Sequence, residues 1–127
     1  MSNQYQEKIW GRVCHLFDSE VGVSLLDVNS GFRCSTHYHK HRWNSFKSIS
    51  AVVDILFLYK EHAQDGILWK PYSLIELNPG QSLDVPPEII HLFQVRKSGK
   101  LVEVYWTTDG TPVDMEDIVR FDEGCRI

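Results

Sequence analysis

The chain has 127 residues, of which 43% are hydrophobic and 24% are charged, and its formal net charge is −4. This composition is that of one globular domain with a core of its own. Because phosphate backbones are bound by concentrated Lys and Arg, the acidic balance argues against a nucleic acid as the main partner. No apolar run approaches the roughly 20 residues that span a bilayer, and no signal peptide is recognisable, so the sequence predicts a cytoplasmic protein without a membrane partner.

Short runs of β-forming residues, separated by turn residues, extend along the chain. Asp65-Gly66 is typical of a hairpin turn, and Asn78-Pro79-Gly80-Gln81 is typical of a type II turn. About ten such runs at regular spacing predict an all-β sandwich or barrel. The strands are expected at residues 13–17, 21–28, 32–39, 45–59, 67–70, 72–77, 82–85, 89–95 and 101–107, with residues 45–59 divided into two strand pieces by a bend.

The two ends of the chain differ from this β pattern. Residues 1–7 are predicted to form a flexible N-terminus, and residues 8–127 are predicted to form a single domain. Near the other end, Asp114 is a favourable N-cap followed by acidic residues, so a short C-terminal helical turn is expected over residues 114–120. The basic run at residues 40–42 is expected to lie in a loop beside the preceding strand.

The expected strand at residues 32–39 contains two histidines one residue apart. Side chains alternate between the two faces of a strand, so His37 and His39 would share a face with Arg33 and Ser35. A row of polar side chains inside a small protein predicts a site, in which Arg33 contacts a polar ligand. The alternative is that Arg33 lies at a sheet edge and reaches solvent.

Two spacings connect this strand with a later segment. Gly31 is followed by five residues, His37, one residue and His39, while Gly80 is followed by five residues, Pro86, four residues and His91. This pair of motifs resembles the two motifs of the cupin superfamily. The resemblance implies a small double-stranded β-helix (cupin or jelly-roll) barrel. It also implies a metal ion bound by the three histidines.

The fourth ligand of the cupin metal is a glutamate, and by register its place is taken here by Asn44. An amide oxygen can bind a cation, although it is neutral and a poorer donor than a carboxylate. Asn44 is therefore either a ligand or a group that orients a bound water, and His41 is the alternative fourth ligand. Zinc is the expected divalent ion, with manganese, iron and nickel as alternatives.

The end of the chain carries a finer resemblance. Leu-Val-Glu-Val-Tyr-Trp at residues 101–106 and Met-Glu-Asp-Ile-Val-Arg-Phe-Asp-Glu at residues 115–123 resemble the end of the cupin domain of type II mannose-6-phosphate isomerases. This implies a metal-dependent isomerase or epimerase that binds a sugar or sugar phosphate, with a base that moves a proton between neighbouring carbons. Glu103 is the candidate base and Arg33 the second candidate catalytic residue. The interpretation that we favour for Glu103 is a structural ion pair with Arg120, and the role of base requires that it point into the barrel.

Two positions depart from the isomerase pattern, because its glutamate ligand is Asn44 here and the arginine after its third histidine is Leu92. The absence of an anionic ligand and of a phosphate-binding arginine favours a non-catalytic cupin that binds a sugar or small anion. The intact three histidines favour the enzyme, and iron bound to them would support dioxygenase chemistry as a third interpretation. Small cupins commonly pair through sheet edges, and edge candidates near the N-terminus predict a homodimer.

Overall fold

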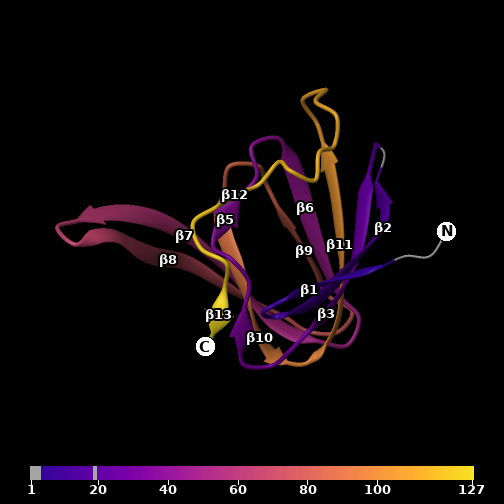
Figure 1. The fold of residues 1–127 in the computed structure, drawn as a ribbon, viewed down its shortest axis with the longest axis horizontal. Helices are drawn as coiled ribbons and strands as arrows, with labels where there is room; N and C mark the ends of the chain where they lie inside the picture. The colour runs from indigo at the N-terminus through magenta and orange to yellow at the C-terminus, as the bar shows by residue number, and fades with distance from the viewer. Residues whose placement is uncertain (1–3, 19) are drawn as a thin grey trace.

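The structure is a computed structural model that describes residues 4–18 and 20–127. The described residues form strands, turns and loops, with no helix among them. Their strands build two antiparallel sheets, which make the body of the molecule in Figure 1. This arrangement confirms the all-β prediction. No helix long and apolar enough to cross a bilayer occurs in this part of the chain.

The first sheet contains six strands in the order β1-β2-β3-β11-β6-β9. Each neighbouring pair is antiparallel. The bounds are β1 (Tyr5–Lys8), β2 (Gly11–Asp18), β3 (Gly22–Val28), β11 (Gly99–Thr107), β6 (Arg42–Ser48) and β9 (Ser82–Val85). β11 and its neighbour β6 position the polar residues described below.

The second sheet has seven strands, and its central path runs in the order β12-β5-β10-β4-β13. β7 joins this sheet through β10 and carries β8 as its other neighbour. The bounds are β12 (Val119–Arg120), β5 (His37–Tyr38), β10 (Ile90–Lys97), β4 (Phe32–Arg33), β13 (Cys125–Arg126), β7 (Val52–Ala63) and β8 (Gly66–Leu77). The C-terminal strands thus pair with the strands that flank the first histidine motif.

Apolar side chains fill the space between the sheets because strand residues point alternately inward and outward. The burial pattern of β3 alternates along its whole length, and that of β6 nearly does so. Tyr105, Phe46, Ile55 and Leu101 are among the largest fully buried side chains. Burying a side chain of this size contributes roughly 1.5–3 kcal/mol, so this layer is the main source of the fold's stability.

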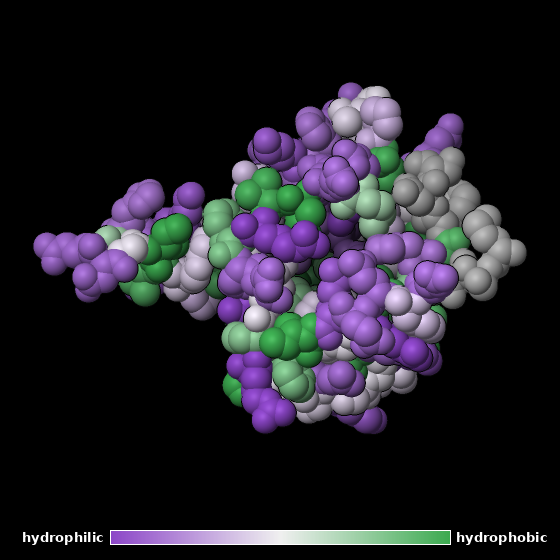
Figure 2. Space-filling model, in the orientation of Figure 1, coloured by the Kyte–Doolittle hydropathy of each residue, from purple (hydrophilic) through white to green (hydrophobic). Residues whose placement is uncertain are grey.

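A long hairpin arm, formed by β7 and β8, projects from the body (Figure 1). β10 supports β7 only as far as Leu58, which lies opposite Ile90. Beyond that point the arm has two strands and no third, and its residues 59–63 are exposed. Figure 2 shows apolar and polar surface side by side along the arm. The exposed apolar residues are Tyr59, Ile67, Leu68, Tyr72 and Leu74.

The structure differs from the sequence prediction at both ends of the chain. Tyr5–Lys8, within the segment predicted to be flexible, form β1 because they pair with β2, and residues 1–3 lie outside the described residues. The helical turn expected over residues 114–120 is absent. Asp114 instead accepts a hydrogen bond from the backbone N–H of Glu116 at 2.9 Å, and β12 pairs with β5. Pairing with a sheet keeps this segment extended.

Gly11, at the start of β2, lies in close contact with the backbone of β3. Its φ is +149°, and a Cβ would lie 1.9 Å from the carbonyl oxygen of Asp27, whereas Gly66 has φ +124° and open space around it. Gly66→Ala should lower the free energy of unfolding by about 1–3 kcal/mol through backbone strain alone. Gly11→Ala should lower it by about 1–3 kcal/mol more, because the clash adds to the strain. Urea unfolding of both variants measures the difference, and equal losses would contradict the packing.

Candidate metal centre

Three histidines converge inside the molecule, as the sequence spacing predicts. His37 in β5 lies directly opposite His91 in β10, and His39 follows immediately after β5. One nitrogen of each ring lies within 4.8 Å of the others. The side chains are buried, with exposed fractions of 7%, 3% and 1% for His37, His39 and His91. The pairing of β5 with β10 therefore brings the two halves of the motif together.

Each of these rings is oriented by a backbone carbonyl. The Nδ1 atoms of His37, His39 and His91 lie 2.7, 2.6 and 2.9 Å from the carbonyl oxygens of Ser35, Asp117 and Ile89. A carbonyl only accepts hydrogen bonds, so each Nδ1 carries the proton and donates it. The lone pair of each ring is therefore on Nε2, the nitrogen that remains to bind a metal.

Burial keeps all three rings neutral. It lowers the pKa of His39 to about 3 and that of His91 to about 4. The pKa of His37 is also lowered, first by burial and then by the neighbouring His91 and His39. Neutral imidazole is the form that coordinates metals, so the site is ready to bind a cation at neutral pH.

Asn44 lies on β6 beside the histidines and is fully buried. Its amide nitrogen is 3.3 Å from Nε2 of His39 and donates a short hydrogen bond to the carboxylate of Glu103. Oδ1 of Asn44 and Nε2 of His91 are buried and have no hydrogen-bond partner among the residues that the structure describes. Buried acceptors without a donor are rare and costly. A cation among the three histidines would satisfy the orphaned His91 nitrogen, so the residues present fit a divalent metal.

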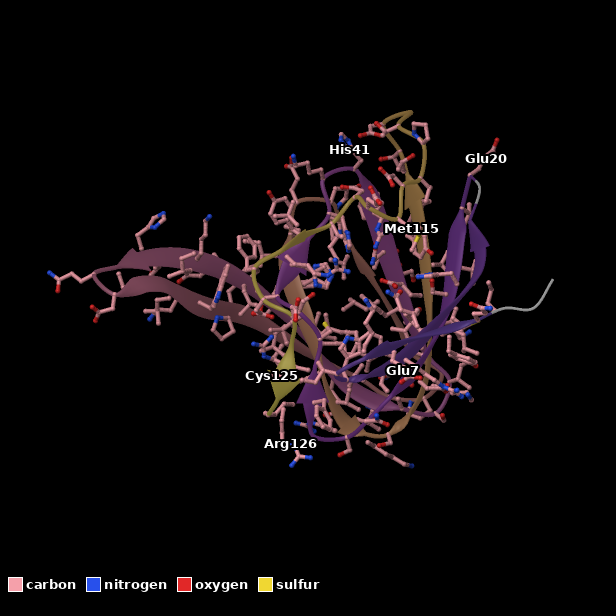
Figure 3. The ribbon with its side chains drawn as sticks, viewed as in Figure 1. Glu7, Glu20, His41, Met115, Cys125 and Arg126 are labelled. Atoms are coloured by element: carbon pink, nitrogen blue, oxygen red, sulfur yellow. The ribbon has the colours of Figure 1, made fainter. Side chains whose placement is uncertain are left out.

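His41, the alternative fourth ligand, lies elsewhere. It is on the surface loop after β5, where Figure 3 shows it at the tip of the loop. Its Nδ1 pairs with the carboxylate of Asp109 at 2.8 Å, and both side chains are about half exposed. The structure thus places Asn44, and not His41, beside the histidine cluster.

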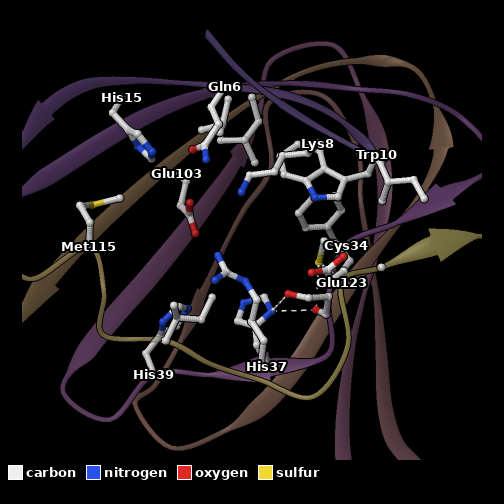
Figure 4. Close-up of a pocket in the computed structure, with 18 of the residues that line it drawn as sticks. Gln6, Lys8, Trp10, His15, Cys34, His37, His39, Glu103, Met115 and Glu123 are labelled. Carbon is white, nitrogen blue, oxygen red and sulfur yellow. Dashed lines mark hydrogen bonds between the residues drawn. The ribbon is translucent and has the colours of Figure 1, made fainter. Parts of the chain in front are cut away.

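His37 and His39 line a cavity of about 750 Å³. Figure 4 shows Glu103 pointing into this cavity from β11, across from His37 and His39. Burial raises the pKa of Glu103, while Arg42 and the hydrogen bond from Asn44 act in the opposite direction. Glu103 makes no ion pair with Arg120 among the described residues, although both line the cavity. The structure therefore places Glu103 as an acid facing the site.

Arg33 is the predicted site residue that the structure does not bring to the cavity. Its guanidinium forms a two-pronged pair with Asp122, at 3.1 and 3.3 Å. The sequence placed it on the histidine face by assuming one continuous strand, but the chain leaves the sheet over residues 34–36, between β4 and β5. The alternation is lost there. Ser35 does reach the site, and its hydroxyl lies 3.0 Å from Nδ1 of His37.

Arg42 lines the cavity and was not identified as a site residue from the sequence. The loop expected over residues 40–42 ends one residue earlier, because Arg42 begins β6 and is only 5% exposed. Its guanidinium lies over the ring of Tyr105, 4.6 Å from the centroid. The sequence contains a pattern that would have predicted this position. Arg42, Asn44 and Phe46 are spaced two residues apart, so on one strand they share a face.

Asp117 holds the first histidine motif in place from the C-terminal segment. Its carboxylate accepts hydrogen bonds from the backbone N–H groups of Lys40, His41 and Arg42, at 2.8, 2.9 and 3.1 Å. Burial acts to raise the pKa of Asp117, but these three donors outweigh it and the pKa is lowered. Because the Asp117 carbonyl also orients His39, one residue fixes both the loop and the ring.

No protein-family model and no curated protein sequence matches the chain. Solved structures do match its fold. A variant of oxalate decarboxylase from Bacillus subtilis has a TM-score of 0.73 at 9% identity and covers 94% of this chain, which spans 30% of that protein. An RmlC-like cupin from Shewanella frigidimarina has a TM-score of 0.64 at 17% identity, over 86% of this chain and 87% of that one.

A third match is Pac13, described as a nucleoside dehydratase, with a TM-score of 0.68 at 8% identity. It covers 95% of this chain and 86% of its own, and a related Streptomyces structure of it contains uridine. Identities this low establish the fold alone. The chain therefore has the cupin fold that the two motifs imply, and the neighbours perform different reactions on it.

The histidine cluster makes a prediction about metal content. His37→Ala and His91→Ala should each lose the metal that copurifies with, or is added to, the wild-type protein, whereas His62→Ala on the exposed arm should retain it. Because the pKa values of His39 and His91 are about 3 and 4, protons compete weakly. Metal content should therefore be the same at about pH 7.5 and about pH 6. Elemental mass spectrometry measures it, and loss in the His62 variant would contradict the assignment.

Proposed function

We propose that this cupin-fold protein is a metal-dependent isomerase or epimerase of a sugar or sugar phosphate. The observation that carries the proposal is the pairing of three neutral, carbonyl-oriented imidazoles with a buried carboxyl group, Glu103, across one cavity. His37, His39 and His91 are the proposed metal ligands, with Asn44 beside them. A metal ion bound by three imidazoles would keep open coordination positions, as catalytic zinc does, so zinc is the proposed ion. Manganese, iron and nickel are the alternatives.

A divalent ion held by these histidines would act as a Lewis acid that polarises a carbonyl or hydroxyl oxygen of the substrate. The proton is then moved by the chain itself. Glu103 has a raised pKa, which brings a carboxyl group closer to the range in which it both takes and returns a proton near neutral pH. Its position facing the histidines supports the role of base for a carbon next to the polarised oxygen.

The cavity supports a small polar substrate. Its volume of about 750 Å³ falls in the range of ligand pockets, which is roughly 300–1,000 Å³. Lys8 from β1 and Met115 from the C-terminal segment line it, so both ends of the chain contribute to its wall.

A non-catalytic cupin is the second candidate, and one contact favours it. The amide of Asn44 donates to Glu103 and lies against Nε2 of His39. This contact engages the proposed base and one proposed ligand at the same time. A protein with that arrangement would bind a sugar or a small anion without converting it.

Turnover separates the two candidates. With zinc, manganese, iron or nickel supplied, at least one member of a panel of aldose phosphates should isomerise. Glu103→Gln should lower kcat by about 10²–10⁴-fold without loss of metal, because the variant keeps the shape and removes the base. Glu76→Gln, exposed on β8, is the matched control. Absence of turnover with every metal would overturn the isomerase and leave the binding protein.

We also propose a homodimer formed through the outer edge of β8. β8 pairs only with β7, so one long edge is open, and an unsupported hairpin is marginally stable by itself. The edge is self-complementary. If the β8 strands of two copies pair antiparallel with their Ser73 residues opposite each other, Lys70 of one copy lies opposite Glu76 of the other. In the same register Tyr72 lies opposite Leu74. A second copy would therefore bury the exposed rings and join opposite charges.

Substitutions test which sheet edge forms the dimer interface. Light scattering should give about twice the chain mass of 14.8 kDa. Leu74→Lys should shift the protein toward the monomer, because it buries a charge in the proposed seam. Tyr5→Lys on β1 tests the N-terminal edge and should leave the dimer intact. A monomeric wild type, or a dimer broken only by Tyr5→Lys, would contradict pairing through β8.

A further inference from the structure

Arg42 is a buried cation with unused hydrogen-bonding capacity. Its side chain is 5% exposed, and it makes no ion pair among the described residues. Glu103 is the buried acid whose charge interacts with it, since Arg42 acts to lower the pKa of that carboxyl group. Nη1 lies 3.4 Å from the carbonyl oxygen of Asp114 and 3.8 Å from the sulfur of Met115, while Nε is buried and has no hydrogen-bond partner in the part of the chain that the structure describes. Arg42 therefore retains a buried donor that an anion entering the cavity would engage beside Glu103.

Several cations elsewhere on the chain are paired. Arg33 pairs with Asp122, Arg96 with Asp54 and Glu76, and Lys100 with Asp27. The three cations that line the cavity, Lys8, Arg42 and Arg120, make no ion pair in the described part of the chain. The same wall carries the acids Glu7, Glu103, Glu116 and Glu123. What distinguishes Arg42 is its burial, because it is the buried cation among the described residues.

The guanidinium of Arg42 is held rigidly. It rests on the ring of Tyr105, a residue with no exposed surface, and its own strand is paired on both sides, with β11 and β9. A guanidinium presents five N–H donors in a planar fork that matches a carboxylate or phosphate. A fork that is already fixed loses little freedom when it binds, which strengthens recognition.

The anion would lie close to the proposed metal ligands. Arg42 and Asn44 share the inner face of β6, and the Asn44 amide reaches His39. After burial, the charge of Arg42 is a further cause that lowers the pKa of both His39 and His91. Lys8 enters the same cavity from β1, where Figure 4 shows its amine pointing toward Glu103. A small molecule can therefore reach the histidines and the cations together.

We propose that Arg42, assisted by Lys8, is an oxyanion-binding subsite that takes the carboxylate or phosphate group of the small molecule bound beside the three histidines. The reaction of the bound molecule rests on the proposed function. The binding of its anionic group to Arg42 does not depend on that function. Leu92 stands where the isomerases have an arginine, and Arg42 would supply a guanidinium to the same cavity from a different strand.

The test is a titration of the metal-free protein, followed by NMR through the side-chain Nε–H signal of Arg42. Inorganic phosphate and acetate are the probes, with chloride at equal ionic strength as the control. Phosphate or acetate should shift this signal in a saturable way, because a charge-assisted hydrogen bond forms. Saturation with phosphate alone assigns a phosphate ligand, and saturation with acetate alone assigns a carboxylate. No saturable shift with either probe overturns the proposal.

Variants distinguish the subsite from general charge attraction. Arg42→Met should raise the Kd for the probe at least about tenfold, Arg42→Lys should raise it less, and Arg96→Met outside the cavity should leave it unchanged. In the variants binding is followed by the 31P signal of phosphate or the methyl signal of acetate. Lys8→Met should weaken binding about threefold to tenfold, and it serves if Arg42→Met does not fold. An unchanged Kd in every variant at these two positions overturns the proposal.

His91→Ala separates this inference from the proposed reaction. The variant should lose metal and retain anion binding, because Arg42 and Lys8 are intact. Anion binding without turnover would refute the isomerase alone. Turnover without anion binding at Arg42 would refute the subsite alone.

Discussion

Three imidazole lone pairs face one another in a buried cavity, and the rest of the site depends on this arrangement. Backbone carbonyls hold a proton on Nδ1 of His37, His39 and His91, so Nε2 is the acceptor in each ring. Nε2 of His91 has no donor among the described residues, and a buried acceptor without a donor is unfavourable where water is excluded. A positive species at the centre of the three rings removes this cost. The fold thus prepares a cation site before any question of reaction arises.

The C-terminal segment is part of this site as well as part of the fold. Asp117 orients His39 through its carbonyl and fixes the loop at residues 40–42 through its carboxylate. β12 then pairs with β5, so the strand that carries His37 is clamped from the same segment. Without this segment, the two-residue strand that carries His37 would pair with β10 alone. The geometry of the first histidine motif is therefore set in part by the C-terminal segment.

The charge balance of the cavity links the two proposals. The histidines proposed as ligands are neutral, Asn44 stands where a carboxylate is expected, and Arg42 and Lys8 make no ion pair among the described residues. A divalent ion would add positive charge beside Arg42, and Glu103 is the buried acid that faces it. An anionic ligand balances both the metal and the arginine. Two features are then consistent with an anionic substrate. One is the amide of Asn44 in place of a ligand carboxylate, and the other is the buried guanidinium of Arg42 nearby.

Most strands and the histidine triad could be predicted from the sequence, because both depend on local spacing. Turn residues mark the strand ends, and the distances Gly31 to His37 and Gly80 to His91 are read along the chain. Which charged groups meet depended instead on tertiary structure. Arg33 turns away because the strand is broken at residues 34–36, and Arg42 turns inward because β6 begins there. Lys8 and Glu103 share a cavity only through sheet pairing, which no local pattern specifies.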